Sequence, residues 1–279
     1  MTASTDGFTS PTLKHVRESW WDDDFTDFLR ETLKPRSGNR ILDVGCGRGL
    51  AQVNIGRLHI SQIRLVGIDL VVSKVIQARQ KTASHNLRAG FAAADACHVP
   101  FADAVFDSLF CVAVLQHIGD VRAALGEFAR VTARNGRIVA VEPDNSKRYM
   151  FSSVPSGRRA FEQAEKFFDV VTVARREKAD AGIGPKLPSL FTEHGIEPIE
   201  VRLFPVAHIT LGPMPAHVWA TRRDAIRSAM KQVSSAAARD AGQSYLDALD
   251  GYEADAAKAG PTFVEIQNTM LFAAVGQRT

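Results

Sequence analysis

The sequence is poor in cysteine and has no long apolar run. Three cysteines occur in 279 residues, at positions 46, 97 and 111, and they form neither a CxxC pair nor a set with histidine at metal-ligand spacing. An odd, scattered set of thiols favours a reducing compartment and predicts no metal site. No apolar run approaches the ~20 residues that cross a membrane, and segment 1–10 lacks the apolar centre of a signal peptide. We therefore expect a cytoplasmic protein with no membrane partner.

A strong charge of one sign is also missing. Lys and Arg number 34 and Asp and Glu number 31, so that the formal net charge is +3. Nucleic-acid-binding domains usually carry a clustered basic stripe. The short basic groups at 175–178 and 222–223 are better explained as solvated helix faces. The sequence therefore predicts no nucleic-acid partner.

The sequence does contain a glycine-rich turn directly after an apolar run. Residues 41–50 read I-L-D-V-G-C-G-R-G-L, with Gly45, Gly47 and Gly49 at alternate positions. Glycine is needed where the backbone turns sharply or lets a ligand lie against it. Nucleotide-binding α/β folds use the turn between the first parallel strand and its helix in this way. Leu50 stands where G-x-G-x-x-G would place its last glycine, which disfavours a nicotinamide dehydrogenase. A turn without a ligand is the alternative.

Short β-rich runs alternate with helical runs around this turn. Such alternation predicts a doubly wound α/β fold with a mostly parallel sheet that is buried on both faces. The predicted strands are 40–44, 64–68, 87–94, 108–112 and 137–141, and the predicted helices between them are 50–58, 73–84 and 121–132.

The pattern changes after Pro143. We predict one domain over 1–279, made of an N-terminal helical lid (1–38), a cofactor-binding core (39–142), and helical insertions at 143–195 and 205–262 that form a substrate cap. The apolar spacing in 12–34 is roughly helical. The later elements predicted are helices at 155–176, 187–194, 216–237 and 244–259, strands at 199–204 and 269–275, and loops at 180–188 and 205–215.

Several motifs occur in a fixed order along the chain. After the glycine motif come P-F-A-D-A-V-F-D at 100–107, F-D-S-L-F-C-V-A-V-L-Q-H at 106–117 and N-G-R-I-V-A-V-E at 135–142. Together these motifs resemble the class I S-adenosylmethionine-dependent methyltransferases, in the branch with quinone-biosynthesis and natural-product enzymes. The resemblance covers residues 41–142. It implies a seven-stranded Rossmann-like sheet in the order 3-2-1-4-5-7-6, with the last strand antiparallel, and S-adenosylmethionine as the cofactor.

The resemblance also implies which residues hold the cofactor. Asp69, at the end of the second strand, would accept both ribose hydroxyls, although capping the next helix is the alternative. Asp95 would accept from the adenine amine and the N–H of Ala96 would meet a ring nitrogen. Asp43 would orient the glycine loop or, through water, the cofactor's ammonium group. The complete set is Asp43, Gly45, Cys46, Gly47, Asp69, Leu70, Asp95, Ala96 and Val112.

A general base is needed only for a hydroxyl or protonated amine acceptor. His117 is the first candidate, because histidine titrates near neutrality and this one follows the fourth strand. Packing beneath the site is the alternative role for His117. Weaker candidates for the base are Glu142, Tyr149 and His208. His15 could instead reach a lid over the cofactor, while Trp20 and Trp21 are expected to pack.

We expect methyl transfer to O, N or C of a small, partly apolar metabolite. Phenylalanines after the fifth strand suit such an acceptor, although most are expected to be core residues. The residues 112–115 are V-A-V-L rather than the Asn/Asp-Pro-Pro-aromatic motif of DNA amino methyltransferases. A protein or RNA acceptor and a non-catalytic S-adenosylmethionine-binding protein remain alternatives. Segment 213–260 could cap the site or pair with another subunit, so a homodimer is open.

Overall fold

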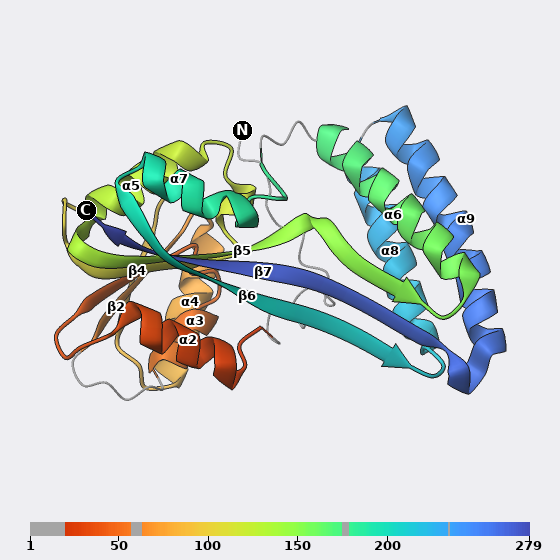
Figure 1. Ribbon diagram of the computed structural model, residues 1–279, viewed down its shortest axis with the longest axis horizontal. Helices are drawn as coiled ribbons and strands as arrows, with labels where there is room; N and C mark the ends of the chain where they lie inside the picture. Colours follow the sequence, from red (N-terminus) through yellow and green to blue (C-terminus); the bar gives the residue numbers. More distant parts are fainter. Residues whose placement is uncertain (1–19, 57–62, 175–178, 234) are drawn as a thin grey trace. The chain divides into compact units, whose positions relative to one another are not determined.

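The computed structural model describes residues 20–56, 63–174, 179–233 and 235–279. Over these residues the chain, drawn as a ribbon in Figure 1, forms a 7-stranded sheet. The strand order is β3-β2-β1-β4-β5-β7-β6. The first five strands are parallel to one another, and β7 runs antiparallel to its neighbours. The fold class and the strand order that the resemblance implied are therefore confirmed.

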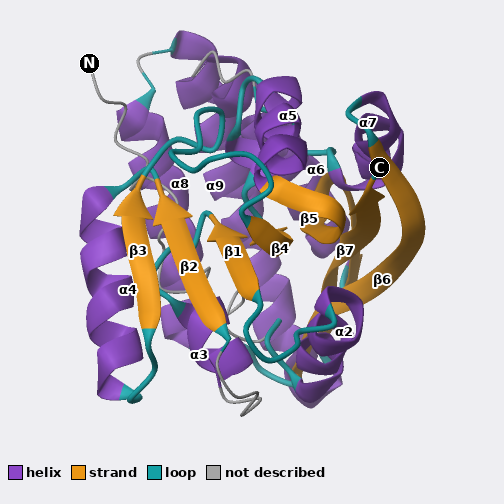
Figure 2. Cartoon of the chain, turned by 90° about the vertical axis from the view of Figure 1, so that its left-hand side faces the viewer, coloured by secondary structure: helices purple, strands orange, loops and turns teal. Residues whose placement is uncertain are grey.

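The strands and helices alternate along the first half of the chain, and the sheet strands lie side by side in Figure 2. The strands are β1 (Arg40–Val44), β2 (Arg64–Asp69), β3 (Ala89–Ala93), β4 (Phe106–Val112), β5 (Thr132–Ser152), β6 (Ile196–Leu211) and β7 (Val264–Arg278). The α-helices are α2 (Asp23–Leu33), α3 (Leu50–Gly56), α4 (Val72–Ser84), α5 (Val121–Val131), α6 (Pro155–Ala174), α7 (Leu187–Glu193), α8 (Ala216–Gln232) and α9 (Ala236–Ala259), and the short 3-10 helices are η2 (Leu115–His117), η3 (Gly184–Lys186) and η4 (Gly260–Thr262).

The central strand β1 is buried on both faces. It pairs with β2 from Arg40 opposite Arg64 and with β4 from Ile41 opposite Ser108. Its first residue is exposed and the next four are buried, as expected for an interior strand of a parallel sheet. Because parallel strands end at the same edge, the loops that follow β1, β2 and β4 gather there, where α/β folds bind ligands.

A side-chain cap sets where α2 begins. The Asp22 carboxylate accepts from the Phe25 N–H at 2.8 Å, so α2 begins at Asp23, and Lys34 in a left-handed conformation ends it. Capping residues of this kind satisfy N–H groups that a helix leaves unpaired. Phe25 and Phe28 of α2 then pack on Phe204 of β6, with ring centroids 5.4 and 5.1 Å apart. Residues 1–19 of the predicted lid, His15 among them, lie outside the described residues.

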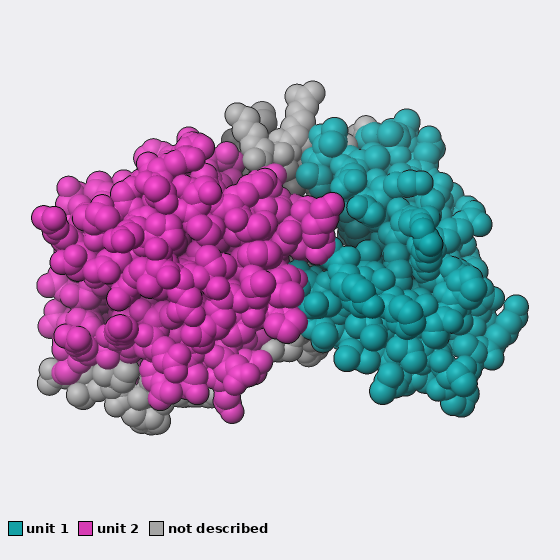
Figure 3. Space-filling model, viewed as in Figure 1, with its two compact units in different colours: residues 1–17, 148–177, 206–269 teal, residues 18–147, 178–205, 270–279 magenta. Residues whose placement is uncertain are grey.

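The chain divides into two compact units, coloured separately in Figure 3. The described part of unit 1 lies within 148–177 and 206–269, and that of unit 2 lies within 18–147, 178–205 and 270–279. Unit 2 holds the glycine loop and the parallel strands. That the insertions at 143–195 and 205–262 form a substrate cap stays a prediction.

Unit 1 has its own core around a buried ion pair. The Arg222 guanidinium forms two hydrogen bonds with the Glu265 carboxylate, at 2.9 and 2.5 Å, and the Tyr252 hydroxyl donates to the same carboxylate at 2.8 Å. Glu265 and Tyr252 are fully buried. The Trp219 ring packs edge-on against Tyr252, with centroids 5.1 Å apart. A buried carboxylate is tolerated because its hydrogen-bond capacity is filled.

The last three strands are longer than the sequence pattern predicted. Strand β5 spans 132–152 rather than 137–141, β6 spans 196–211 rather than 199–204, and β7 spans 264–278 rather than 269–275. The strand continues through Pro143, which lies beyond the last pairing with β4, Val112 opposite Val141, so its missing N–H costs no bond to β4. Pro205 is tolerated because β6 is at the edge of the sheet. The predicted loop at 205–215 was therefore wrong for residues 205–211, which belong to β6. Helix α9 begins eight residues before the predicted start at 244, because Ser235 caps it.

The phenylalanines after β5 are mainly core residues. Phe167 and Phe191 are fully buried, and Phe204 packs on α2. Phe168 is 47% exposed, and Phe151, which lies within β5, is 43% exposed. These rings therefore do not by themselves outline an acceptor pocket. Most of them were expected to be core residues.

Candidate functional site

The glycine loop follows β1 at the carboxyl edge of the sheet. Its three glycines have φ values of +73° (Gly45), +53° (Gly47) and +78° (Gly49), which disfavour residues with a side chain. A Cβ on Gly45 would lie 2.3 Å from Cγ2 of Val114, and one on Gly49 would lie 3.0 Å from the Cα of Ala78. A Cβ on Gly47 would meet no atom closer than the Gly45 oxygen at 3.9 Å, so the space beside this residue is open to a ligand. Two glycines thus allow tight packing and the third leaves an accessible cradle.

Backbone and side-chain bonds from β2 hold this loop. The N–H groups of Gly45 and Cys46 donate to the Ile68 carbonyl at 2.7 and 2.8 Å. The Gly47 N–H donates to Oδ2 of Asp69 at 3.0 Å, and the Val71 N–H donates to Oδ1 at 2.9 Å. Sequence reasoning missed this role of Asp69, since it joins residues from two strands. A carboxylate offers about four acceptor positions, so the two bonds leave capacity for ribose hydroxyls, and that role stays a prediction.

Asp43 is the second-last residue of β1 and carries a buried carboxyl group. It is 3% exposed, and its Oδ2 atom has no hydrogen-bond partner among the described residues. Burial, and then the charge of Asp69, raise the pKa of Asp43 well above its usual value, while the Gln52 side chain acts in the opposite direction. A buried carboxyl oxygen without a donor beside an open glycine backbone fits a cationic ligand group such as an ammonium. The residues present therefore fit the methionine part of S-adenosylmethionine.

The residues predicted to face the adenosine part follow β2 and β3. Asp95 accepts from the Cys97 N–H at 2.8 Å through Oδ1, and its side chain is 50% exposed. Ala96 next to it is half-buried. Leu70, directly after Asp69, is 65% exposed although it is apolar. These side chains therefore present both an acceptor and an apolar surface at the edge of the sheet.

The turn after β4 completes this part of unit 2. Val112 is half-buried, and the next residues turn sharply, since Ala113 has a φ of +55°. The Glu142 carboxylate accepts from the N–H groups of this turn and is fully buried. Both of its oxygens are committed to backbone donors, so Glu142 is poorly suited to act as the base for which it was a weak candidate. No local sequence signal could have shown this bond, because it joins residues 28 positions apart.

The other candidate bases are exposed. His117 is the last residue of η2, and its backbone N–H donates to the Val114 carbonyl at 2.9 Å. Tyr149 and His208 are exposed residues of unit 1. The role of His117 as a base therefore stays a prediction.

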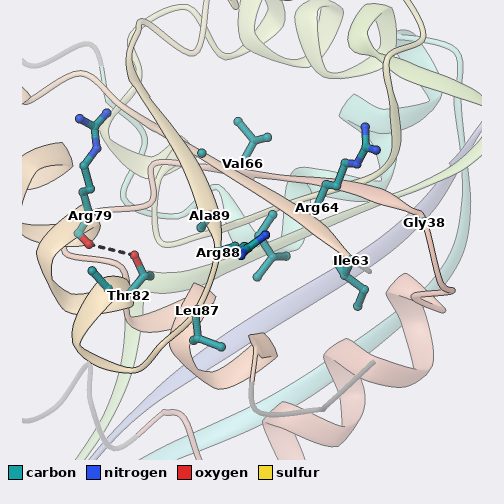
Figure 4. A pocket seen from close by; sticks show the side chains of 12 residues that line it. Gly38, Ile63, Arg64, Val66, Arg79, Thr82, Leu87, Arg88 and Ala89 are labelled. Atoms are coloured by element: carbon teal, nitrogen blue, oxygen red, sulfur yellow. Dashed lines mark hydrogen bonds between the residues drawn. The ribbon is translucent and has the colours of Figure 1, made fainter. Parts of the chain in front are cut away.

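A hollow of about 700 Å³ lies at the opposite end of β2 and β3 from the glycine loop (Figure 4). Its wall includes Arg64, Arg79 and Arg88, together with Thr82, whose hydroxyl donates to the Arg79 carbonyl. Because strands β2 and β3 begin here, this hollow is separate from the loops at the carboxyl edge. In the described part of the chain, no three His, Cys, Asp or Glu side chains are placed to hold a metal ion. No described helix is long and apolar enough to span a membrane.

Comparisons with known proteins agree with this geometry. The sequence family described as a methyltransferase domain matches residues 42–140. An O-methyltransferase of Aspergillus nomiae is 33% identical over 142 residues, which cover 46% of this chain and 62% of that protein. A demethylmenaquinone methyltransferase of Deinococcus radiodurans is 33% identical over 106 residues, which cover 38% of this chain and 44% of that enzyme. The matches thus span about half the length of these curated relatives.

A solved structure shows the same fold over most of the chain. The crystal structure of a proposed methyltransferase from Bacillus halodurans covers 92% of this chain and 100% of its own, with a TM-score of 0.58 and 14% sequence identity. The sheet order, the glycine loop and the match at 42–140 therefore agree with one another. Residues 42–140 therefore belong to the methyltransferase-domain family, within a fold shared with that solved structure.

Proposed function

We propose that this protein transfers a methyl group from S-adenosylmethionine to a small, partly apolar acceptor. The observation that carries the proposal is the open backbone at Gly47 between two acidic residues, the buried Asp43 and the loop-holding Asp69. This cradle lies at the edge of the sheet where α/β folds bind ligands. When bound, S-adenosylmethionine supplies a methyl group already activated on a sulfonium.

The chain's own task is then to bind, orient and exclude water. In this proposal Asp43 neutralises the ammonium group, Gly45, Cys46 and Gly47 line the methionine part, and Asp69 accepts from the ribose. The remaining predicted contacts to the adenosine part come from Leu70, Asp95, Ala96 and Val112. Holding two reactants in line can lower a barrier by roughly 7–11 kcal/mol, so no metal or covalent intermediate is required.

An oxygen acceptor is supported by the Aspergillus protein, which is named an O-methyltransferase. A small-molecule acceptor is supported by the Deinococcus enzyme, which is named for demethylmenaquinone. For a hydroxyl acceptor, the exposed His117 is the proposed base. A cytoplasmic location and action without a nucleic-acid or membrane partner are part of the same proposal.

Two alternatives predict different results. A protein or RNA acceptor needs a basic surface, and the net charge of +3 gives that reading little support. A non-catalytic S-adenosylmethionine-binding protein has the same cradle but transfers no methyl group. One fold can serve all of these purposes, so the distinction needs a measurement.

The test is methyl transfer from methyl-labelled S-adenosylmethionine to a panel of small phenols and quinols. We expect label in the organic extract for the wild type, and loss of that label in Asp69→Ala. Asp107→Asn is the control. The Asp107 carboxylate also accepts from a backbone N–H, that of Arg40 at 2.8 Å, but it lies at the start of β4, away from the glycine loop. Tight cofactor binding without transfer to any acceptor, including protein and RNA fractions, would favour the non-catalytic alternative.

A further inference from the structure

The turn after β4 holds a conformation that needs support. Ala113 is one of the few non-glycine residues with positive φ, at +55°, which costs free energy for a residue with a Cβ. Its N–H donates to the Val141 carbonyl at 2.8 Å, and two tight-turn bonds follow, from His117 to the Val114 carbonyl and from Ile118 to the Leu115 carbonyl. A strained turn persists only where its surroundings fix it.

Glu142 of β5 fixes this turn from within the core. Its Oε1 atom accepts from the N–H groups of Val114 and Leu115, both at 2.7 Å, and its Oε2 atom accepts from Gln116 at 3.3 Å. The side chain is fully buried. A buried carboxylate is strongly destabilising unless donors surround it, and backbone N–H groups bonded to a charged acceptor make strong bonds. Glu142 and the turn therefore stabilise each other.

The turn after β4 in turn packs against the glycine loop. Both methyl carbons of Val114 press on the space above Gly45, since a Cβ on Gly45 would lie 2.3 Å from one and 2.9 Å from the other. The same loop carries the open backbone of Gly47, two residues further on. If Val114 moved away, the glycine loop would lose this packing contact. If Val114 moved closer, it would displace the backbone of the loop. The contacts thus run from the Glu142 carboxylate through Val114 to the cofactor cradle, entirely within unit 2.

We infer that Glu142 is a positioning residue for methyl transfer, because it holds the turn after β4 against the glycine loop and so sets the affinity for S-adenosylmethionine. The same carboxylate fixes the backbone that leads to His117, the proposed base. The hydrogen bonds of Glu142 go to the turn, and Glu142 acts on the glycine loop through it. This inference rests on the proposed function, since it concerns the same cofactor.

A double-mutant cycle on cofactor affinity tests this inference. The titration of wild type, Glu142→Gln, Val114→Ala and the double variant with S-adenosylmethionine is followed by calorimetry. Glutamine keeps the volume of Glu142 but replaces one acceptor with a donor that faces a backbone N–H. We expect Glu142→Gln to weaken binding by about tenfold, the effect of losing one charge-assisted hydrogen bond. The double variant should lose less than the product of the two single losses, because Val114 no longer transmits the shift.

Asp107→Asn is again the control for a purely structural effect. Both Glu142→Gln and Asp107→Asn remove a carboxylate that accepts a backbone N–H on the same sheet, so both should lower Tm. Only Glu142→Gln should lower the affinity. Unchanged affinity in Glu142→Gln, or losses that multiply independently in the double variant, would overturn the inference while the proposed function stands. If the wild type does not bind the cofactor, the proposed function is wrong. If the wild type binds it and Glu142→Gln binds it equally well, only the inference about Glu142 is wrong.

Hydrogen exchange keeps the inference testable if Glu142→Gln does not fold. In the cofactor-free wild type, the amides of Val114, Leu115 and Gln116 should exchange slowly, because Glu142 accepts from all three without a ligand. Exchange of these amides at the rate of an open loop would contradict the proposed clamp.

Discussion

Asp43→Asn should stabilise the cofactor-free protein and weaken the cofactor site. In the folded chain Asp43 is buried with one carboxyl oxygen lacking a partner, and burial followed by the charge of Asp69 raises its pKa. A buried polar group without its hydrogen bond costs about 1–3 kcal/mol. Asparagine removes the charge, and its amide nitrogen could donate to Oε1 of Gln52, which has no partner among the described residues. The variant should therefore gain about 1–3 kcal/mol of unfolding free energy at pH 7.

The pH dependence of this gain has a definite sign. Because the pKa of Asp43 is higher in the folded than in the unfolded chain, the folded state binds more protons between the two values. The unfolding free energy of the wild type therefore falls as pH rises through this window, whereas a low pH removes the penalty. Asp43→Asn should lose that part of the slope, so the difference between the two proteins should widen from acid toward neutral pH.

Urea unfolding of both proteins at several pH values, without cofactor, measures the difference. A variant that is less stable than the wild type at pH 7, or a difference that does not change with pH, would refute the reasoning about the buried carboxyl group. The same variant should bind S-adenosylmethionine more weakly than the wild type, because the ammonium loses its counter-charge. Gain of stability with loss of binding is the pattern expected of a residue kept for function.

Three further predictions concern other parts of the chain. Gly45→Ala should lower Tm and abolish cofactor binding, because its Cβ would lie 2.3 Å from Val114. Adding Val114→Ala should recover part of the lost Tm but should not relieve the strain of the +73° φ. An unchanged Tm in Gly45→Ala would contradict the packing. Glu265→Gln should cost about 3 kcal/mol by leaving the charge of Arg222 without its counter-charge. Burial alone would raise the pKa of Glu265, but the bonds and charge of Arg222 outweigh it and lower the pKa, so this stability should be present at neutral pH and lost as pH falls, and an equal acid sensitivity in the variant would argue against it. Burial and then the charge of Asp95 raise the pKa of Cys97 to about 11, so only about one thiol in a thousand is ionised at pH 8 and a disulfide reagent should react far more slowly than with free cysteine; rapid labelling would rule this out.

The sequence was sufficient where local pattern determines structure. The three alternate glycines after an apolar strand predicted the cradle, and the alternation of strands and helices predicted the parallel sheet. The helix boundaries of α4 and α5 fell within a residue of their predicted positions because apolar spacing and, for α5, the Asp120 cap define them. These features depend on residues close together in the chain.

The sequence was insufficient where distant residues meet. The bonds from Glu142 to the turn after β4 and from Arg222 to Glu265 join residues 28 and 43 positions apart, and neither has a local signature. The extension of β5 and β6 past prolines depends on which neighbouring strand is present at that point, which the alternation pattern does not reveal. Asp69 was assigned to the ribose from its position alone, and its bond to Gly47 became visible only once the two strands were paired.

The most direct test of the central claim is calorimetric titration of the wild type and of Asp69→Ala with S-adenosylmethionine and S-adenosylhomocysteine. The account predicts micromolar binding of both compounds by the wild type, and weakening by about tenfold or more in the variant, the scale of one good hydrogen bond. Failure of the wild type to bind either compound would contradict the assignment of the glycine loop as the cofactor site.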